Sequence, residues 1–84
     1  MQLIIALPTN KQKIEIAWAE FNTITGNYVI QEGHAPTVLL LLEQKPFIYC
    51  LKDGKQEVVM VQWGIVEITR TTITVLLNMA KSID

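Results

Sequence analysis

Short apolar runs are the feature of this sequence that most constrains its fold. β-branched and aromatic residues come in runs of about five to eight, and Gly, Pro, Asn and Asp separate one run from the next. No stretch of a dozen residues keeps its apolar side chains at the spacing of one helix face. The pattern therefore predicts an all-β chain.

One of these runs breaks its own alternation. Lys13 to Trp18 alternates between the two faces of a strand, but the alternation shifts before Phe21. Either the strand ends near Ala19, or a bulge between Trp18 and Phe21 shifts the register. We favour the bulge.

Glycines mark the expected turns in the second half of the chain. Asp53-Gly54 lies between the apolar runs Phe47 to Leu51 and Gln56 to Gln62, which predicts a hairpin with a two-residue turn. Gly64 indicates a bend or a close approach of two backbones. Thr69 to Thr71 forms a tight corner before the last expected strand.

The run from Thr37 to Leu42 does not alternate at all. Such a strand is either buried on both faces or has an outer face that meets another protein. The tail, Asn78 to Asp84, is expected to form one helical turn or to fray. The remaining expected strands are Gln2 to Leu7, Tyr28 to Ile30, Ile65 to Ile68 and Thr72 to Leu77.

Together the runs predict about 8–10 short strands in a small sandwich or flattened barrel of two antiparallel sheets. A parallel sheet is disfavoured because no crossover helix is available. The 84 residues are too few for a second hydrophobic core, so we expect one domain over residues 1–84.

The amino-acid composition limits the kinds of partner and the environment that we expect for this chain. Half of the residues are hydrophobic and only 18% are charged, so either the core is unusually full or part of the surface is covered. The net charge of −1 provides no basic field, which argues against nucleic acid. A single Cys50 fits a reducing, cytoplasmic environment. The longest apolar run, Val38 to Leu42, is far shorter than the roughly 20 residues of a membrane span.

The Glu32-Gly33-His34-Ala35-Pro36 loop holds the only histidine. Glu32 and His34 could form a catalytic dyad with Cys50 as nucleophile, but the neighbours of Cys50 have the character of a strand core. We favour a shaped loop in which Gly33 permits an unusual backbone angle and His34 bonds locally. One His and one Cys cannot complete a zinc site, and no phosphate-binding glycine motif occurs. We therefore expect no catalytic, cofactor-binding or metal-binding residues.

Three blocks carry a family likeness. They are Gly33 to Pro36, Gly64 to Ile68 and Ile73 to Leu76, and their order and spacing fit from Leu3 to about Leu77. In this pattern the chain resembles the N-terminal β-sandwich domain of the epsilon subunit of bacterial F-type ATP synthases.

The chain also departs from the pattern of that family. Val29 stands at a family glycine, Glu32 at a proline, and Trp63 at the first glycine of a Gly-Gly pair. Asn27 stands where the family often has an acidic residue facing the membrane rotor. Family members continue into a C-terminal helical hairpin that can inhibit hydrolysis, whereas this sequence ends at Asp84, so we expect a naturally short form without that inhibition.

The resemblance implies a non-catalytic central-stalk subunit that links the gamma subunit to the c-ring during proton- or sodium-driven ATP synthesis. It would lie at the cytoplasmic face of the cell membrane, without inserting into it. The expected c-ring contacts are Asn27, Tyr28, Glu32 and His34. The expected gamma contacts are Leu40, Leu42, Val61 and Trp63, and ordinary core packing is the alternative role for each of these residues. The alternative function is a stand-alone β-barrel that binds a small ligand or a peptide, which a deep closed pocket would favour.

Overall fold

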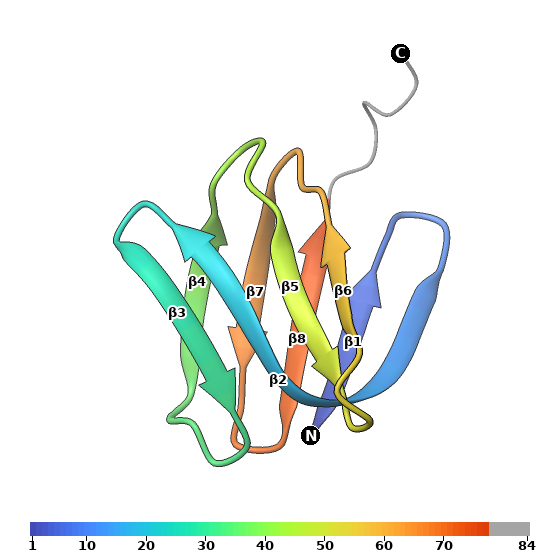
Figure 1. The fold of residues 1–84 in the computed structure, drawn as a ribbon. Helices are drawn as coiled ribbons and strands as arrows, with labels where there is room; N and C mark the ends of the chain where they lie inside the picture. The colour runs from blue at the N-terminus through green and yellow to red at the C-terminus, as the bar shows by residue number, and fades with distance from the viewer. Residues whose placement is uncertain (78–84) are drawn as a thin grey trace.

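Eight β-strands make up the regular structure of residues 1–77, the part of the chain that the computed structural model describes (Figure 1). No helix occurs in this part, which confirms the prediction of an all-β fold. The tail for which a helical turn was considered lies outside the described residues. In chain order the strands are β1 (Gln2–Ala6), β2 (Lys11–Thr23), β3 (Gly26–Gln31), β4 (Thr37–Leu41), β5 (Phe47–Leu51), β6 (Gln56–Val59), β7 (Gly64–Ile68) and β8 (Thr72–Leu77).

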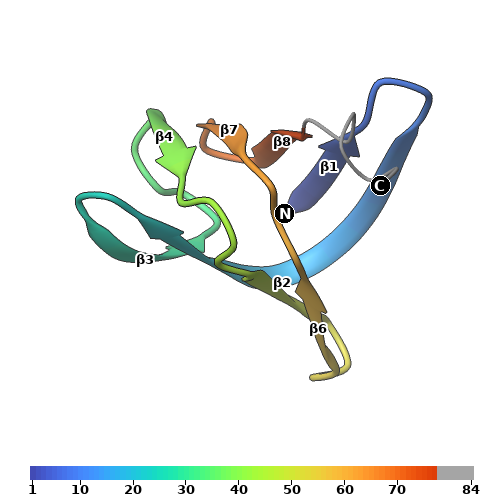
Figure 2. The same cartoon turned by 90° about the horizontal axis from the view of Figure 1, so that it is seen from above.

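The strands form two packed layers, as the sequence predicts. One layer has the order β1-β8-β7-β4, and the other contains β3, the second half of β2, β5 and β6. The long strand β2 belongs to both layers: its first half pairs with β1 and its second half with β3 and β5 (Figure 2). One pairing departs from the expected antiparallel sheets, because β1 runs parallel to β8. These two strands can be parallel because the whole intervening chain serves as their connection.

A bulge in β2 marks the point where the strand changes layers. The register against β5 shifts between Ile16 and Trp18, slightly earlier in the chain than the predicted bulge between Trp18 and Phe21. The Ile16 N–H donates to the carbonyl of Met1 (2.9 Å), so the pairing with the first layer reaches up to the bulge. Beyond it, Ala19 and Phe21 point into the core. The extra residue thus restores the inward direction of the apolar side chains.

The β5–β6 hairpin is confirmed, but its loop is longer than the predicted two residues. The Leu51 N–H donates to the Lys55 carbonyl (2.8 Å), and the Gly54 N–H donates to the Leu51 carbonyl (2.9 Å). Gly54 has φ = 97°, and an Asp53 carboxylate oxygen accepts the Lys55 N–H (2.9 Å). This is the three-residue hairpin in which a glycine follows a turn, and the Asp side chain stabilises it.

The core lies between the layers and receives side chains from seven of the eight strands. Phe21 and Phe47, which are almost fully buried, have ring centroids 5.3 Å apart in a tilted arrangement. Branched aliphatic side chains of the other layer pack against these rings. The largest of the fully buried aliphatic residues are Leu3, Ile16, Ile30, Val66, Ile68, Ile73 and Val75.

Gly64 begins β7 at a close approach of two strands, which confirms one of the two roles predicted for it. A Cβ atom at this position would lie 2.7 Å from the backbone oxygen of Leu76 and 2.8 Å from Cδ2 of Leu77. Gly64 is paired with Leu77 in the sheet, so the backbone of β8 cannot move away without breaking the ladder.

We expect G64A to lower the free energy of unfolding by about 1–3 kcal/mol, because the added methyl group meets a backbone atom in a packed region. This cost exceeds the roughly 0.5–1 kcal/mol that alanine would gain over glycine within a strand. Urea unfolding of the variant and the wild type measures the difference. Q62A, which changes an exposed residue of the same segment, is the control and should stay within about 0.5 kcal/mol. A stability of G64A equal to that of Q62A would contradict the steric account.

Candidate interaction surfaces

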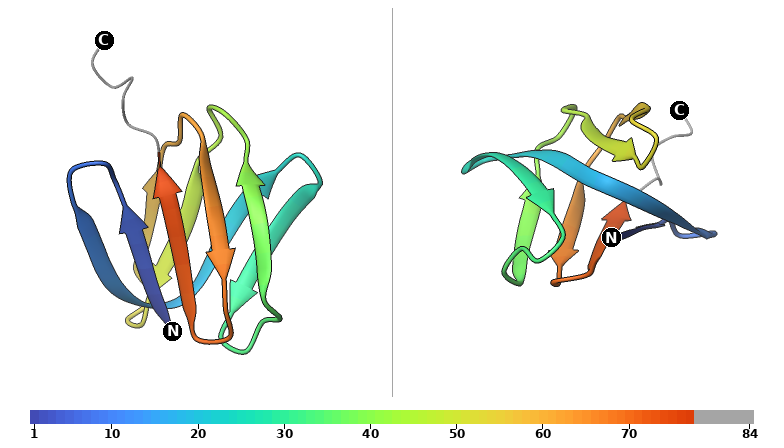
Figure 3. Two further views of the ribbon diagram at one scale, coloured as in Figure 1. Left: turned by 180° about the vertical axis from the view of Figure 1, so that it is seen from behind. Right: turned by 60° about the horizontal axis from the view of Figure 1, so that its bottom comes forward.

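Figure 3 (left) shows the β1-β8-β7-β4 layer from its outer side, which we term the outer sheet face. Most of the side chains on this face are apolar. The register places four apolar residues in one row across the four strands, and the side chains of Leu40 and Leu76 in this row are 56% and 47% exposed. A second row carries Glu67, the one charged residue that these four strands present on the face; Lys11 and Lys13 of β2 continue the two rows beyond β1. The rows are Leu40, Ile65, Leu76 and Ala6, and Val38, Glu67, Thr74 and Ile4; Thr72 and Gln2 complete the face.

Two open hollows flank this face. One, of about 330 Å³, is lined by Trp63, Ile65 and Leu76 together with Pro8 and Leu77. The other, of about 180 Å³, lies beside β4 and is lined by Thr23, Ile24, Thr25, Val38, Leu39 and Leu40. Both are open to solvent, so neither is the deep closed pocket that a carrier of small ligands requires.

The structure separates the four residues predicted to contact a gamma subunit. Leu40 lies on the outer sheet face, and Trp63, which is 50% exposed, borders it. Leu42 is half-buried directly after β4, where its N–H donates to the Asn22 carbonyl (3.1 Å). Val61 is only 3% exposed and belongs to the core, so packing accounts for it and we do not count it among the surface residues.

Sequence analysis did not select the other residues of the outer sheet face. Ile65, Glu67 and Leu76 fall within two blocks that were used only for the family likeness. The signal that could have found them is the period of two in strands: once Val66 and Val75 are placed in the core, their neighbours must point outward. The sequence alone does not show which of the two faces is buried.

The predicted c-ring contacts lie along one strand. Asn27 and Tyr28 are at the beginning of β3, and Glu32 and His34 follow its end. Glu32 follows Asn27 by five residue steps of extended chain, which corresponds to roughly 17 Å. Within residues 1–77, β3 pairs only with β2, so its other edge has no partner strand (Figure 1). The four residues therefore share a strand edge rather than a compact cluster.

Asn27 is held by polar neighbours on β2. Its amide nitrogen donates to a carboxylate oxygen of Glu20 (2.9 Å) and to the side-chain oxygen of Asn22 (3.1 Å). Tyr28 is half-buried, and its hydroxyl lies 3.0 Å from that of Thr25. An amide that donates two bonds is well suited to this place, whereas a carboxylate would face Glu20.

The loop between β3 and β4 is bound to the corner between β7 and β8. Gly33, with φ = 89°, donates its N–H to the Arg70 carbonyl (2.7 Å), and the Arg70 guanidinium lies 3.4 Å from the Gly33 carbonyl. The predicted local bond of His34 is present, since its Nδ1 lies 2.7 Å from the Ala35 carbonyl. Cys50 is buried on β5, and its thiol donates to the Leu51 carbonyl (3.4 Å). The hydrogen bonds of residues 1–77 thus do not join Cys50 to His34.

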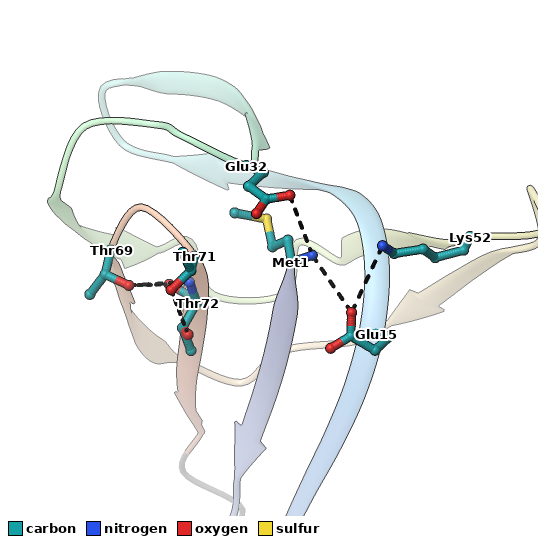
Figure 4. A network of polar contacts seen from close by, with 7 residues as sticks. All are labelled: Met1, Glu15, Glu32, Lys52, Thr69, Thr71 and Thr72. Atoms are coloured by element: carbon teal, nitrogen blue, oxygen red, sulfur yellow. Dashed lines mark hydrogen bonds and ion pairs between the residues drawn. The ribbon is translucent and has the colours of Figure 1, made fainter.

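Ion pairs connect the same end of the molecule to the first strand (Figure 4). The amino group of Met1 lies 3.7 Å from a carboxylate oxygen of Glu15 and 3.8 Å from one of Glu32, and Lys52 lies 3.9 Å from Glu15. Both carboxylates are about two-thirds exposed, so each pair contributes at most about 1 kcal/mol. In the adjacent corner, the Thr69 hydroxyl accepts the Thr72 N–H (3.1 Å).

Tyr49 shows an electrostatic effect of packing. Burial raises the pKa of its hydroxyl, the nearby Glu57 carboxylate raises it further, and Lys55 partly opposes the change. The ring lies against Phe47, with centroids 6.5 Å apart. Both observations describe a tyrosine that packs at the margin of the core.

Two kinds of functional feature are absent from the part of the chain that the structure describes. Among residues 1–77, no three His, Cys, Asp or Glu side chains come together in a way that could hold a metal ion. The same part of the chain contains no helix with the length and apolar character needed to cross a membrane.

The two packed layers, the apolar outer face and the unpaired edge of β3 define a class: small β-sandwich proteins with an exposed apolar sheet face. Residues 3–83 match the family described as the ATP synthase delta/epsilon chain, beta-sandwich domain. The chain belongs to this family. A comparison with curated proteins finds no significant match.

Solved structures share the fold. A chain in the cryo-EM structure of the Euglena gracilis mitochondrial ATP synthase, OSCP/F1/c-ring in rotational state 1, superimposes with a TM-score of 0.79 and 15% identity over 89% of this chain and 48% of that one. A chain in the structure of the Tetrahymena thermophila mitochondrial ATP synthase, central stalk/c-ring, gives a TM-score of 0.74 and 14% identity over 93% and 63%. Our chain thus spans about half to two-thirds of these neighbours.

We expect N27D to be less stable than N27A by about 0.5–1 kcal/mol at pH 7, because like charges on paired strands destabilise a sheet. Repulsion from Glu20 would raise the pKa of both carboxyl groups in the folded state. The destabilisation is therefore present above about pH 5 and fades below about pH 4, where the groups are protonated in both states. Urea unfolding at several pH values measures it. Equal stability of N27D and N27A at pH 7 would show that the Glu20 carboxylate does not repel a carboxylate at position 27.

Proposed function

We propose that this chain acts as an epsilon-type subunit of the central stalk of an F-type ATP synthase and joins a gamma subunit to the c-ring. In this role it is non-catalytic and transmits the ion-driven rotation of the ring to the stalk. The observation that carries the proposal is the apolar row Leu40, Ile65, Leu76 and Ala6 on the outside of a member of this family. The complex would hold the chain at the cytoplasmic face of the membrane, peripheral to it.

The outer sheet face is our proposed gamma contact. Its exposed Leu40 and Leu76 and the adjacent Trp63 provide the apolar and aromatic centre that stable interfaces usually have. The four strands are joined by three continuous ladders. A contact on this sheet can resist torque better than a contact made by single loops, because the sheet deforms little when it is loaded.

The unpaired edge of β3 is our proposed c-ring contact. Asn27 and Tyr28 at one end and Glu32 and His34 at the other would touch the ring along the length of the strand. The loop that carries Glu32 and His34 is bonded to the Arg70 corner, and this corner directly joins two strands of the outer sheet face. A force on the loop would therefore reach the proposed gamma contact through backbone hydrogen bonds.

We expect L40D to weaken binding of the gamma subunit by roughly 30-fold or more, because it places an unpaired charge at the centre of an apolar interface. The matched control is V58D. Val58 is 61% exposed and lies on β6 in the opposite layer, so this variant should bind as the wild type does. Isothermal titration calorimetry with the gamma subunit of the same ATP synthase measures both. Loss of binding in V58D but not in L40D would assign the contact to the other layer.

We expect cysteines introduced at Asn27 and at His34 to form disulfides with cysteines in the polar loops of the c subunits, because both ends of β3 lie on the ring. Each cysteine is introduced into the C50S variant, so that the native thiol cannot form disulfides, even though Cys50 is buried. T9C, in the exposed turn between β1 and β2, is the control and should not cross-link. Cross-linking is measured on the assembled complex under mild oxidation. Products from only one of the two positions would restrict the contact to one end of the strand.

A further inference from the structure

We infer that Glu67 is the charge-recognition residue of the outer sheet face, and that the partner surface covering this face presents a Lys or Arg side chain to it. The inference rests on the proposed gamma contact and adds the chemistry of the surface that fits it.

Glu67 is alone in its surroundings. It lies on β7, directly between Val38 on β4 and Thr74 on β8, with the apolar row of Leu40, Ile65 and Leu76 beside it. Of the ten outward-facing positions on the four strands, Glu67 holds the one charge. Within residues 1–77, its carboxylate takes part in no ion pair and no side-chain hydrogen bond.

In the chain without a partner, water solvates this carboxylate, since Glu67 is exposed. A partner that covers the apolar row must also cover Glu67, because the two rows are only two residues apart along the strands, about 7 Å. Removing a carboxylate from water costs several kcal/mol unless a counter-charge or donors replace the water. Thr74 beside it offers a hydroxyl. The cation in the same row, Lys13 of β2, is opposite Ile4 and lies three strand spacings from Glu67, roughly 14 Å, so the counter-charge has to come from the partner.

The same requirement gives selectivity. An apolar surface without a cation would bury Glu67 unpaired, and an acidic surface would repel it, so both are rejected. The apolar row by itself does not distinguish one apolar partner from another. Glu67 would also fix the position of the partner along the strands, because only one register brings the cation to the carboxylate.

The test measures binding of the gamma subunit to the 84-residue chain by calorimetry at about 50 and about 500 mM NaCl. We expect E67Q, which keeps the shape of the side chain, to bind at least about 10-fold more weakly than the wild type at low salt and to show a smaller salt dependence. E67K should bind more weakly still, because the introduced lysine would face the Lys or Arg side chain of the partner and repel it. The control is E57Q, which removes the same charge from β6 in the opposite layer and should match the wild type.

Circular dichroism confirms that each variant is folded. If the wild type binds the gamma subunit and E67Q binds equally well with the same salt dependence, the role of Glu67 is refuted while the proposed function stands. If E57Q weakens binding as much as E67Q does, the effect is one of net charge and the assignment to Glu67 is again refuted. Failure of the wild type to bind would instead overturn the proposed function.

Discussion

The change of register between Ile16 and Trp18 is the constraint on which the architecture depends. Before it, β2 pairs with β1 and belongs to one layer; after it, β2 pairs with β3 and β5 in the other. Side chains alternate with a period of two, so a regular strand would turn Ala19 and Phe21 outward if Ile16 pointed inward. Both residues are fully buried, and Phe21 contacts Phe47 at the centre of the core. One extra residue therefore lets a single strand contribute to the core from both layers.

Much of the fold could be predicted because local signals are strong at the strand ends. The bounds of Phe47–Leu51 and Thr72–Leu77 agree with the predicted runs, since turn residues flank each of them. One failure concerns residues that are distant in the sequence and another a local turn. The parallel partner of β1 is the last strand, and nothing near residues 1–7 in the sequence specifies that pairing. The hairpin loop was predicted too short because Asp-Gly is common to two turn types, and the choice depends on which backbone pair closes the loop.

The candidate surfaces were less predictable than the fold, for a related reason. The apolar character of Thr37 to Leu42 indicated either full burial or an outer face that meets a partner, and the exposure of Val38 and Leu40 excludes full burial. An isolated apolar residue carries no such signal: Val61 lies in the core and Trp63 lies half-exposed two residues later. Glu67 stands out only after the register is known, because its isolation is a property of four neighbouring strands.

The small share of charged residues in this chain can be explained by the large area that its proposed contacts would cover. A stable interface buries about 800 Å² on each partner, so two such contacts would cover roughly a third of the 5069 Å² surface of this chain. Charged residues are depleted at the centres of interfaces because each would have to be desolvated. In a small domain that binds on a sheet face and along a strand edge, charges are therefore unfavourable over roughly a third of the surface, in keeping with its reduced share of charged residues. The charged residues that remain on a covered face must be those whose partners can neutralise them, which is the reason why a lone Glu67 is informative and an exposed glutamate in a turn is not.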